Sequence, residues 1–355
     1  MRLLIYFLLY SGLAGCGRDT PQAVLDNYLE RVASTLEQPL PELITARVQA
    51  LPARRERRLP VVEVRAGILD ALDLGDCGLL PLIAERNSIL GKVKPPSAVM
   101  RYEFQFFALL DACYRRDQRN PINEREFSIY LAEIYRTKRK NLSAIVWNAL
   151  FTSAELEANL SLAKDPLPLL GNPGYGDSLR ALQALDRYRQ AVLSQRSGAP
   201  FRVPPANQDL ENHYFALYRS TYGGQLFSSL RLLTAKLNQA ATLIDRTLEH
   251  RPFCLSGRPT PKAQYLKNVF TQFYAGEVQP YLAMVHRQGE PWLTLMAQLA
   301  APLDGESGPL DDYRQRMLST TAPDSLWSQY QRSLQRHTES WQRVLHQCGL
   351  MPTAS

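Results

Sequence analysis

Apolar residues recur at steps of three and four along most of this chain, which is the spacing of one face of an α-helix. The first such segment opens at Thr20-Pro21, a capping residue followed by proline at the first helical position. The spacing then continues through Val24, Leu25 and Tyr28. No stretch alternates as a strand would, so we predict an all-α protein, a multi-helix array or bundle. The later helices are expected at 63–74, 78–91, 97–117, 124–139, 141–151, 153–164, 178–197, 207–250, 261–288, 290–301, 309–320 and 323–347.

The longest expected helix, 207–250, carries an apolar seam that predicts packing along its whole length. We expect Gly223-Gly224 to bend it, because glycine pairs are common sites of helix kinks. The seam consists of Leu226, Leu230, Leu233, Leu237, Ile244 and Leu248.

Proline and glycine interrupt the helical pattern at two places. Residues 39–60 predict an irregular, partly extended strap. Residues 165–176 separate an N-terminal helical half, 16–165, from a C-terminal half, 177–355. The two halves are expected to pack together and could form one structural unit.

The N-terminus predicts export. Residues 1–15 contain one charge and an apolar run too short for a membrane span, which needs about 20 residues, but suited to a secretory signal. The following Leu13-Ala14-Gly15-Cys16 resembles a bacterial lipobox. This resemblance to lipoproteins implies cleavage before Cys16 and acylation of the new N-terminus, and Gly17 in place of Asp implies the outer membrane. The alternative is an ordinary secretory signal with an incidental cysteine.

The net charge of the chain and the short segment between Cys16 and Thr20 indicate which molecules it meets. Three residues separate Cys16 from Thr20, a reach of about 10 Å, so the body should sit on the bilayer. The net charge of +7 supports weak attraction to anionic headgroups or cell-wall polymers. We expect the membrane as partner through the lipid, together with envelope proteins or cell-wall polymers. An exported, anchored chain would not meet nucleic acid.

The remaining cysteines are Cys77, Cys113, Cys254 and Cys348. An even number in an exported protein predicts two disulfides, with three pairings possible. Helices 78–91 and 97–117, joined by a short turn, would form an antiparallel hairpin that brings Cys77 level with Cys113. Cys254 is then left for Cys348. A metal site is the alternative, but there is no C-x-x-C and no nearby histidine pair.

Two stretches of ordinary residues resemble an uncharacterised proteobacterial lipoprotein family, known as domain-of-unknown-function 3080. That resemblance implies an exported lipoprotein and no reaction, and no catalytic residues can be transferred from it. The stretches contain Cys77-Gly78-Leu79-Leu80, Ile83-Ala84-Glu85-Arg86-Asn87-Ser88 and Leu90-Gly91-Lys92-Val93, and then Gly257-Arg258-Pro259-Thr260-Pro261, Asn268-Val269-Phe270 and Val278-Gln279-Pro280-Tyr281-Leu282.

One polar cluster is a candidate site. Glu85, Arg86 and Asn87 are consecutive in an otherwise apolar helix, and Arg101 and Glu103 lie across the expected hairpin turn. Successive helical residues point about 100° apart, so at least one must face the packed side and need a partner. The cluster is either a polar pocket for a head group, glycan or peptide, or an internal ion-pair network. We favour the network, because structural networks commonly resemble sites.

Other polar and aromatic patterns have simpler interpretations. The basic runs Arg54–Arg58 and Arg136–Lys140 could touch anionic phospholipid, but a solvated charged face is favoured. Tyr214, Tyr218 and Tyr222 form a stripe at steps of four, which favours core or interface packing over stacking on sugar.

Known catalytic signatures are missing. Ser161-Leu162-Ala163-Lys164 matches S-x-x-K, but the S-D-N and K-T-G of penicillin-recognising enzymes do not accompany it. There is no G-x-S-x-G and no H-E-x-x-H, and we predict no cofactor and no metal. The leading hypothesis is a lipid-anchored envelope protein that binds or scaffolds. The alternative is a cell-wall or lipid-processing enzyme using Glu85 or Glu103 in a cleft between the halves.

Overall fold

The computed structural model of the chain describes residues 20–64, 74–88, 94–120, 125–171, 174–205, 209–250, 252–303 and 308–351. The predicted signal peptide 1–15, Cys16 and most of the expected helix 63–74 lie outside these ranges. The all-α prediction is confirmed, since none of the described residues forms a strand. The helices are α1 (Pro21–Leu36), α2 (Arg54–Arg57), η1 (Leu74–Cys77), α4 (Leu80–Asn87), α5 (Pro96–Asp117), α6 (Arg125–Phe151), α7 (Ala154–Asn159), α8 (Gly174–Arg196), α9 (Leu210–Ser220), α10 (Tyr222–His250), η4 (Leu255–Gly257), α11 (Pro261–Val269), η5 (Phe270–Val278), α12 (Gln279–Leu299), α13 (Asp311–Tyr313), η6 (Arg314–Leu318) and α14 (Leu326–Gln347).

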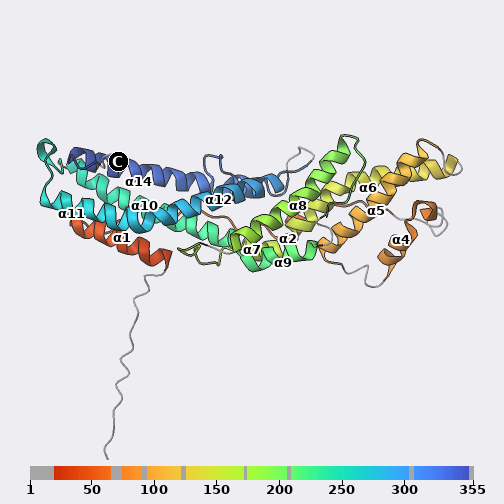
Figure 1. Cartoon of the computed structure of the whole chain (residues 1–355), viewed down its shortest axis with the longest axis horizontal. Coiled ribbons are helices and arrows are strands. Elements are labelled where there is room, and N and C mark those ends of the chain that lie inside the picture. The colour runs from red at the N-terminus through yellow and green to blue at the C-terminus, as the bar shows by residue number, and fades with distance from the viewer. Residues whose placement is uncertain are drawn as a thin grey trace, which may run out of the picture.

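The molecule is a rod with two groups of helices along its length (Figure 1). At one end, α10 packs against α1 and α14, with α11, η5 and α12 beside them. At the other end, α5 pairs with α6, and α8 packs on α9. The seam on α10 is buried as predicted from Leu226 to Ile244, and Leu248 is half-buried. Within the described ranges, no helix combines the length and apolar composition needed to cross a bilayer.

The packing interleaves the two parts of the sequence on either side of 165–176. The first helix, α1, contacts α10, α11 and η5 from the C-terminal part. The first helices after the boundary, α8 and α9, contact α5, α6 and α7 from the N-terminal part. Each helix group therefore needs both parts of the sequence to complete its core.

The expected bend at Gly223-Gly224 was misplaced. The helix ends at Ser220, Thr221 takes the left-handed conformation with φ of 44°, and α10 starts at Tyr222. The glycine pair instead allows close packing, because a Cβ on Gly224 would lie 2.1 Å from the backbone oxygen of Ser161. The two glycines therefore let the segment after α7 lie directly on α10.

Two other predicted helix breaks are absent. The expected helices 124–139 and 141–151 are one continuous helix, α6. The expected break between 288 and 290 is also wrong, because α12 continues through Gly289 and Pro291 to Leu299. Gly289 is needed for contact, since a Cβ there would lie 2.9 Å from the Leu226 side chain. The helical path from α11 to α12 includes a π-helical segment, η5, that the sequence pattern did not predict.

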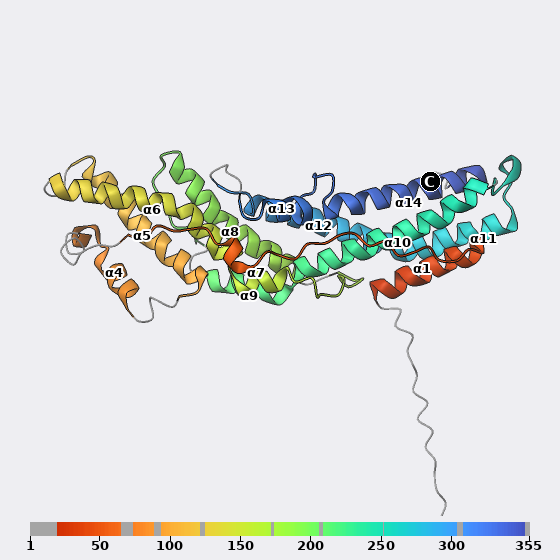
Figure 2. The same ribbon diagram turned by 180° about the vertical axis from the view of Figure 1, so that it is seen from behind.

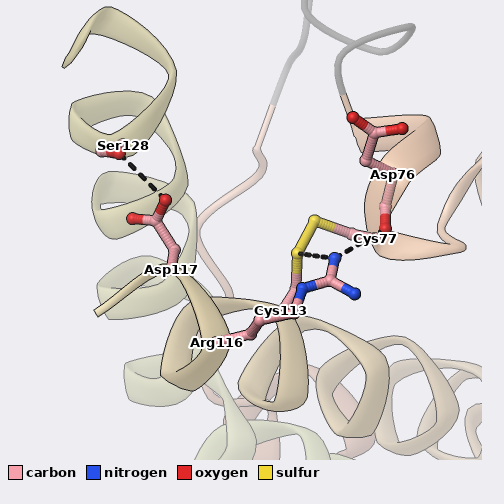
Figure 3. Close-up of a disulfide and its surroundings, with 6 residues drawn as sticks. All are labelled: Asp76, Cys77, Cys113, Arg116, Asp117 and Ser128. Carbon is pink, nitrogen blue, oxygen red and sulfur yellow. Dashed lines mark hydrogen bonds between the residues drawn. A yellow bond between two sulfur atoms is a disulfide. The ribbon is translucent and has the colours of Figure 1, made fainter. Parts of the chain in front are cut away.

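Both predicted disulfides are present. Cys77 is bonded to Cys113 and Cys254 to Cys348, with Cα–Cα distances of 5.3 and 5.1 Å. Closing loops of these lengths is worth about 4 and 5 kcal/mol in the chain-entropy model. Figure 3 shows the first bridge joining η1 to α5, where Arg116 also donates a hydrogen bond of 2.8 Å to the Asp76 carbonyl oxygen.

Candidate binding site

The predicted polar cluster is partly assembled, as an ion-pair network. Glu103 on α5 is only 4% exposed, and its carboxylate accepts hydrogen bonds of 2.7 and 3.0 Å from Lys138 Nζ on α6. Arg86 on α4 donates a third, of 2.6 Å. Lys138 is itself 7% exposed, and burial lowers its pKa while Glu103 opposes that shift. Glu103 is therefore held by two cations inside a junction of three helices.

The other members of the cluster lie outside that junction. Glu85 pairs with Lys94 at 2.6 Å near the surface, and Asn87 is exposed. Arg101 is also exposed, because it is two residues from Glu103 and points about 200° away around the helix. The structure thus brings together Arg86 and Glu103 but not Glu85, Asn87 or Arg101. Both carboxylates are engaged in ion pairs.

The first basic run is a solvated face at Arg55 and Arg58, as favoured from the sequence, but not at Arg57. Arg57 is 1% exposed and pairs with Glu157, which also binds Arg54. The Trp147 indole N–H donates to the Arg57 carbonyl oxygen at 2.7 Å. The run therefore attaches the strap to α6 and α7. The sequence pattern did not predict this contact, because Glu157 lies about 100 residues from Arg57.

A second buried acid escaped sequence analysis. Asp111 on α5 accepts hydrogen bonds from Arg115, from the Tyr135 hydroxyl and from the backbone N–H of Phe201. It joins α5 and α6 to the segment that follows α8. A lone aspartate in an apolar helix carries no pattern from which these partners could be inferred.

The candidate binding site is a cavity of about 240 Å³ between η5 and α14. Its walls combine three aromatic rings with neutral polar groups and two apolar side chains. The Phe270 and Trp341 rings lie 5.0 Å apart between centroids, and Phe270 lies 5.5 Å from Tyr274. The lining consists of Phe270, Tyr274, Gln279, Thr338, Trp341, Gln342, Leu345 and Met351.

The π-helical turn supplies one wall of this cavity. Phe270 and Tyr274 both belong to η5, where the chain switches from α-helical to π-helical hydrogen bonding. Such segments are frequent at functional sites. Trp341 comes from α14, about seventy residues further along the sequence, and is almost fully buried.

A buried hydrogen-bond network holds Trp341, one of the rings that line the cavity. Trp341 Nε1 donates to the Tyr28 hydroxyl at 2.8 Å, and that hydroxyl lies 2.7 Å from His337 Nε2. Complete burial lowers the pKa of His337 to about 3, so the ring stays neutral at physiological pH.

This arrangement favours binding over proton transfer. None of the described side chains that line the cavity carries a charge. Gln279, Thr338 and Gln342 are exposed and offer amide and hydroxyl groups, while the rings offer apolar faces. The site is smaller than the roughly 300–1,000 Å³ typical of drug-sized ligands, so it fits a single ring. The described residues contain no group of three His, Cys, Asp or Glu placed to hold a metal ion.

The fold and site together define an all-helical, doubly disulfide-bonded protein with an uncharged aromatic cavity. The family model described as "Protein of unknown function (DUF3080)" matches residues 25–352, and the chain belongs to that family. No curated protein and no solved structure matches the chain.

Replacing Glu103→Gln should lower the free energy of unfolding by about 3 kcal/mol, because it leaves Lys138 buried without a counter-charge. Urea denaturation followed by circular dichroism at pH 7 measures this loss. The control Glu85→Gln removes an exposed ion pair and should cost less than about 1 kcal/mol. Equal losses in the two variants would contradict the structural role of Glu103.

Acidification should destabilise the protein through His337. The unfolded imidazole takes up a proton near pH 6.5 and the folded one only near pH 3, so stability falls as the pH drops through this window. The loss due to this residue should reach about 2 kcal/mol at pH 5. Urea unfolding is measured at pH 7.5 and at pH 5. His337→Gln should reduce the difference in unfolding free energy between the two by about 2 kcal/mol, whereas the control His346→Gln, at an exposed position, should leave it unchanged. A pH dependence unchanged by His337→Gln would refute this assignment.

Proposed function

We propose that this protein is an outer-membrane lipoprotein with a periplasmic helical body that acts by binding. The signal peptide would be removed before Cys16, and acyl chains on that residue would hold the body at the membrane. The lipobox-like Leu13-Ala14-Gly15-Cys16 supports this placement. Two disulfides are also typical of an oxidising compartment.

The binding role rests on the uncharged aromatic cavity. A sugar ring has apolar C–H faces and a rim of hydroxyl groups, and the cavity pairs ring walls with amide and hydroxyl groups in the same way. We therefore propose that it holds one neutral sugar ring of a cell-wall polymer. Anionic headgroups fit less well, because the lining offers them no cation.

Catalysis is the less favoured alternative. The carboxylates suggested for it, Glu85 and Glu103, are ion-paired with Lys94, and with Lys138 and Arg86. A general acid near neutral pH needs a raised pKa, whereas adjacent cations favour the charged carboxylate. These residues therefore suit a structural role better than an acid–base role.

The anchor is tested by Cys16→Ala, which should leave the precursor without acyl chains because no thiol remains to be modified. Metabolic labelling with a fatty acid, followed by mass spectrometry of the N-terminal peptide, measures the modification. Gly17→Asp is a matched control that should keep the label but shift the protein to the inner membrane. Normal labelling of Cys16→Ala would contradict the anchor.

Sugar binding is tested by titrating the mature protein in detergent with the β-1,4-linked dimer of N-acetylglucosamine in a calorimeter. Gln279→Ala and Gln342→Ala should each weaken binding about fivefold, because each removes one hydrogen bond at an exposed position. Gln335→Ala is the control, since that side chain bonds to Glu339 elsewhere on α14 and should not matter. Absence of binding, or equal affinity in all three variants, would contradict the proposal.

A further inference from the structure

The start of α1 and the segment 161–171 lie end to end along one face of α10. Asp26 near the start of α1 pairs with Lys236 at 2.6 Å. The backbone N–H of Leu167 donates to the Ser229 hydroxyl at 2.8 Å. Ser229 and Lys236 are seven residues apart, so they differ by only about 20° around the helix. The segment 161–171 therefore continues the line of α1.

This segment presents a leucine completely to solvent. Leu170 is 102% exposed, at the tip of a turn closed by a 3.3 Å hydrogen bond from the Gly171 N–H to the Pro168 carbonyl oxygen. Gly171 permits the turn with φ of +96°. The base of the segment is fastened to α10, where the Ser228 hydroxyl donates to the Lys164 carbonyl oxygen at 2.5 Å. The segment that carries Leu170 is thus attached to α10 by hydrogen bonds at its base.

The neighbouring helix α9 adds two exposed aromatic side chains. Phe215 is 57% and Tyr218 54% exposed, and the Arg219 guanidinium lies 5.5 Å from the centre of the Phe215 ring. Positions 215, 218 and 219 fall within about 100° of one another around the helix. The opposite face of α9, with Tyr214 and Leu217, is buried.

These parts lie along one edge of the rod. In Figures 1 and 2 the start of α1, the segment after α7 and helix α9 all form the lower edge, while α14 forms the upper edge of its group. We call this set of elements the anchor edge, and its exposed side chains include Leu170 in segment 161–171 and Phe215, Tyr218 and Arg219 on α9.

We propose that the anchor edge rests on the lipid bilayer, so that the rod lies along the membrane with Leu170 inserted among the acyl chains. This inference rests on the proposed acylation of Cys16. Only four residue steps connect Cys16 to Thr20, so the start of α1 lies within about 14 Å of the acylated residue. Exposed apolar groups on the same edge of the rod as that point are then placed to meet the membrane surface.

The chemistry of the anchor edge suits that position. An exposed leucine enters hydrocarbon, whereas phenylalanine and tyrosine rings beside an arginine are typical of the bilayer interface. The guanidinium can pair with lipid phosphate. Residues Phe215, Tyr218 and Arg219 extend the contact from the anchor toward the other end of the rod, which favours a lying over a standing molecule.

Photo-crosslinking of the full-length protein in cells tests this orientation. Benzoylphenylalanine is introduced at position 170, at position 215, or at the control position 255, where Leu255 is 75% exposed between α10 and α11. Irradiation should yield at least tenfold more phospholipid adduct at 170 and 215 than at 255, measured by mass spectrometry of the modified peptide.

The outcomes distinguish the proposed orientation of the rod from the proposed acylation of Cys16. The N-terminal peptide of each variant is examined for acyl chains in the same samples. If the protein is acylated but position 170 gives no excess of lipid adduct, the proposed orientation is wrong and the acylation is still supported. The same conclusion follows if position 170 crosslinks to a protein instead of lipid. An unmodified Cys16 would overturn both.

Discussion

Three buried side chains, Tyr28, His337 and Trp341, connect the first helix of the body to the last across 309 residues of sequence. Their hydrogen bonds satisfy polar atoms that burial would otherwise leave unpaired, at a cost of about 1–3 kcal/mol each. The same residues fix the Trp341 ring at the cavity and hold α1 on α14. The position of the aromatic cavity relative to the start of the chain therefore follows from one network, and changes there would affect both.

The other end of the rod is stabilised differently. Helix α4 has no fully buried residue, and its apolar packing is limited to the partly buried Leu82 and Ile83. The Cys77–Cys113 bridge precedes it and the Arg86–Glu103 pair lies near its end, so both of its ends are attached to α5. The buried Glu103–Lys138 pair then joins α5 to α6, although such a pair specifies an arrangement more than it adds net stability. Covalent and ionic links therefore supplement the limited apolar contacts of α4.

The sequence predicted features that depend on local spacing and missed those that depend on distant partners. The helical class, the seam of α10 and both cysteine pairs followed from periodicity and helix length. The left-handed Thr221 and the merging of two expected helices into α6 have no local signature, because packing overrides weak propensities. The sequence predicted a solvated Arg57, because its partner Glu157 belongs to a separate helix, α7. Likewise, no spacing rule brings Phe270 to Trp341, so the cavity could not be predicted.

The persistence of an aromatic cavity is itself informative. Apolar surface facing water forgoes about 25 cal/mol for each square ångström that burial would remove, so folding alone favours filling such a hollow. The rings cannot collapse into it, because Trp341 is held by Tyr28 and because Phe270 and Tyr274 are positioned by the π-helical turn. A ligand that covered these rings would remove their apolar surface from water, which supports the proposed binding role.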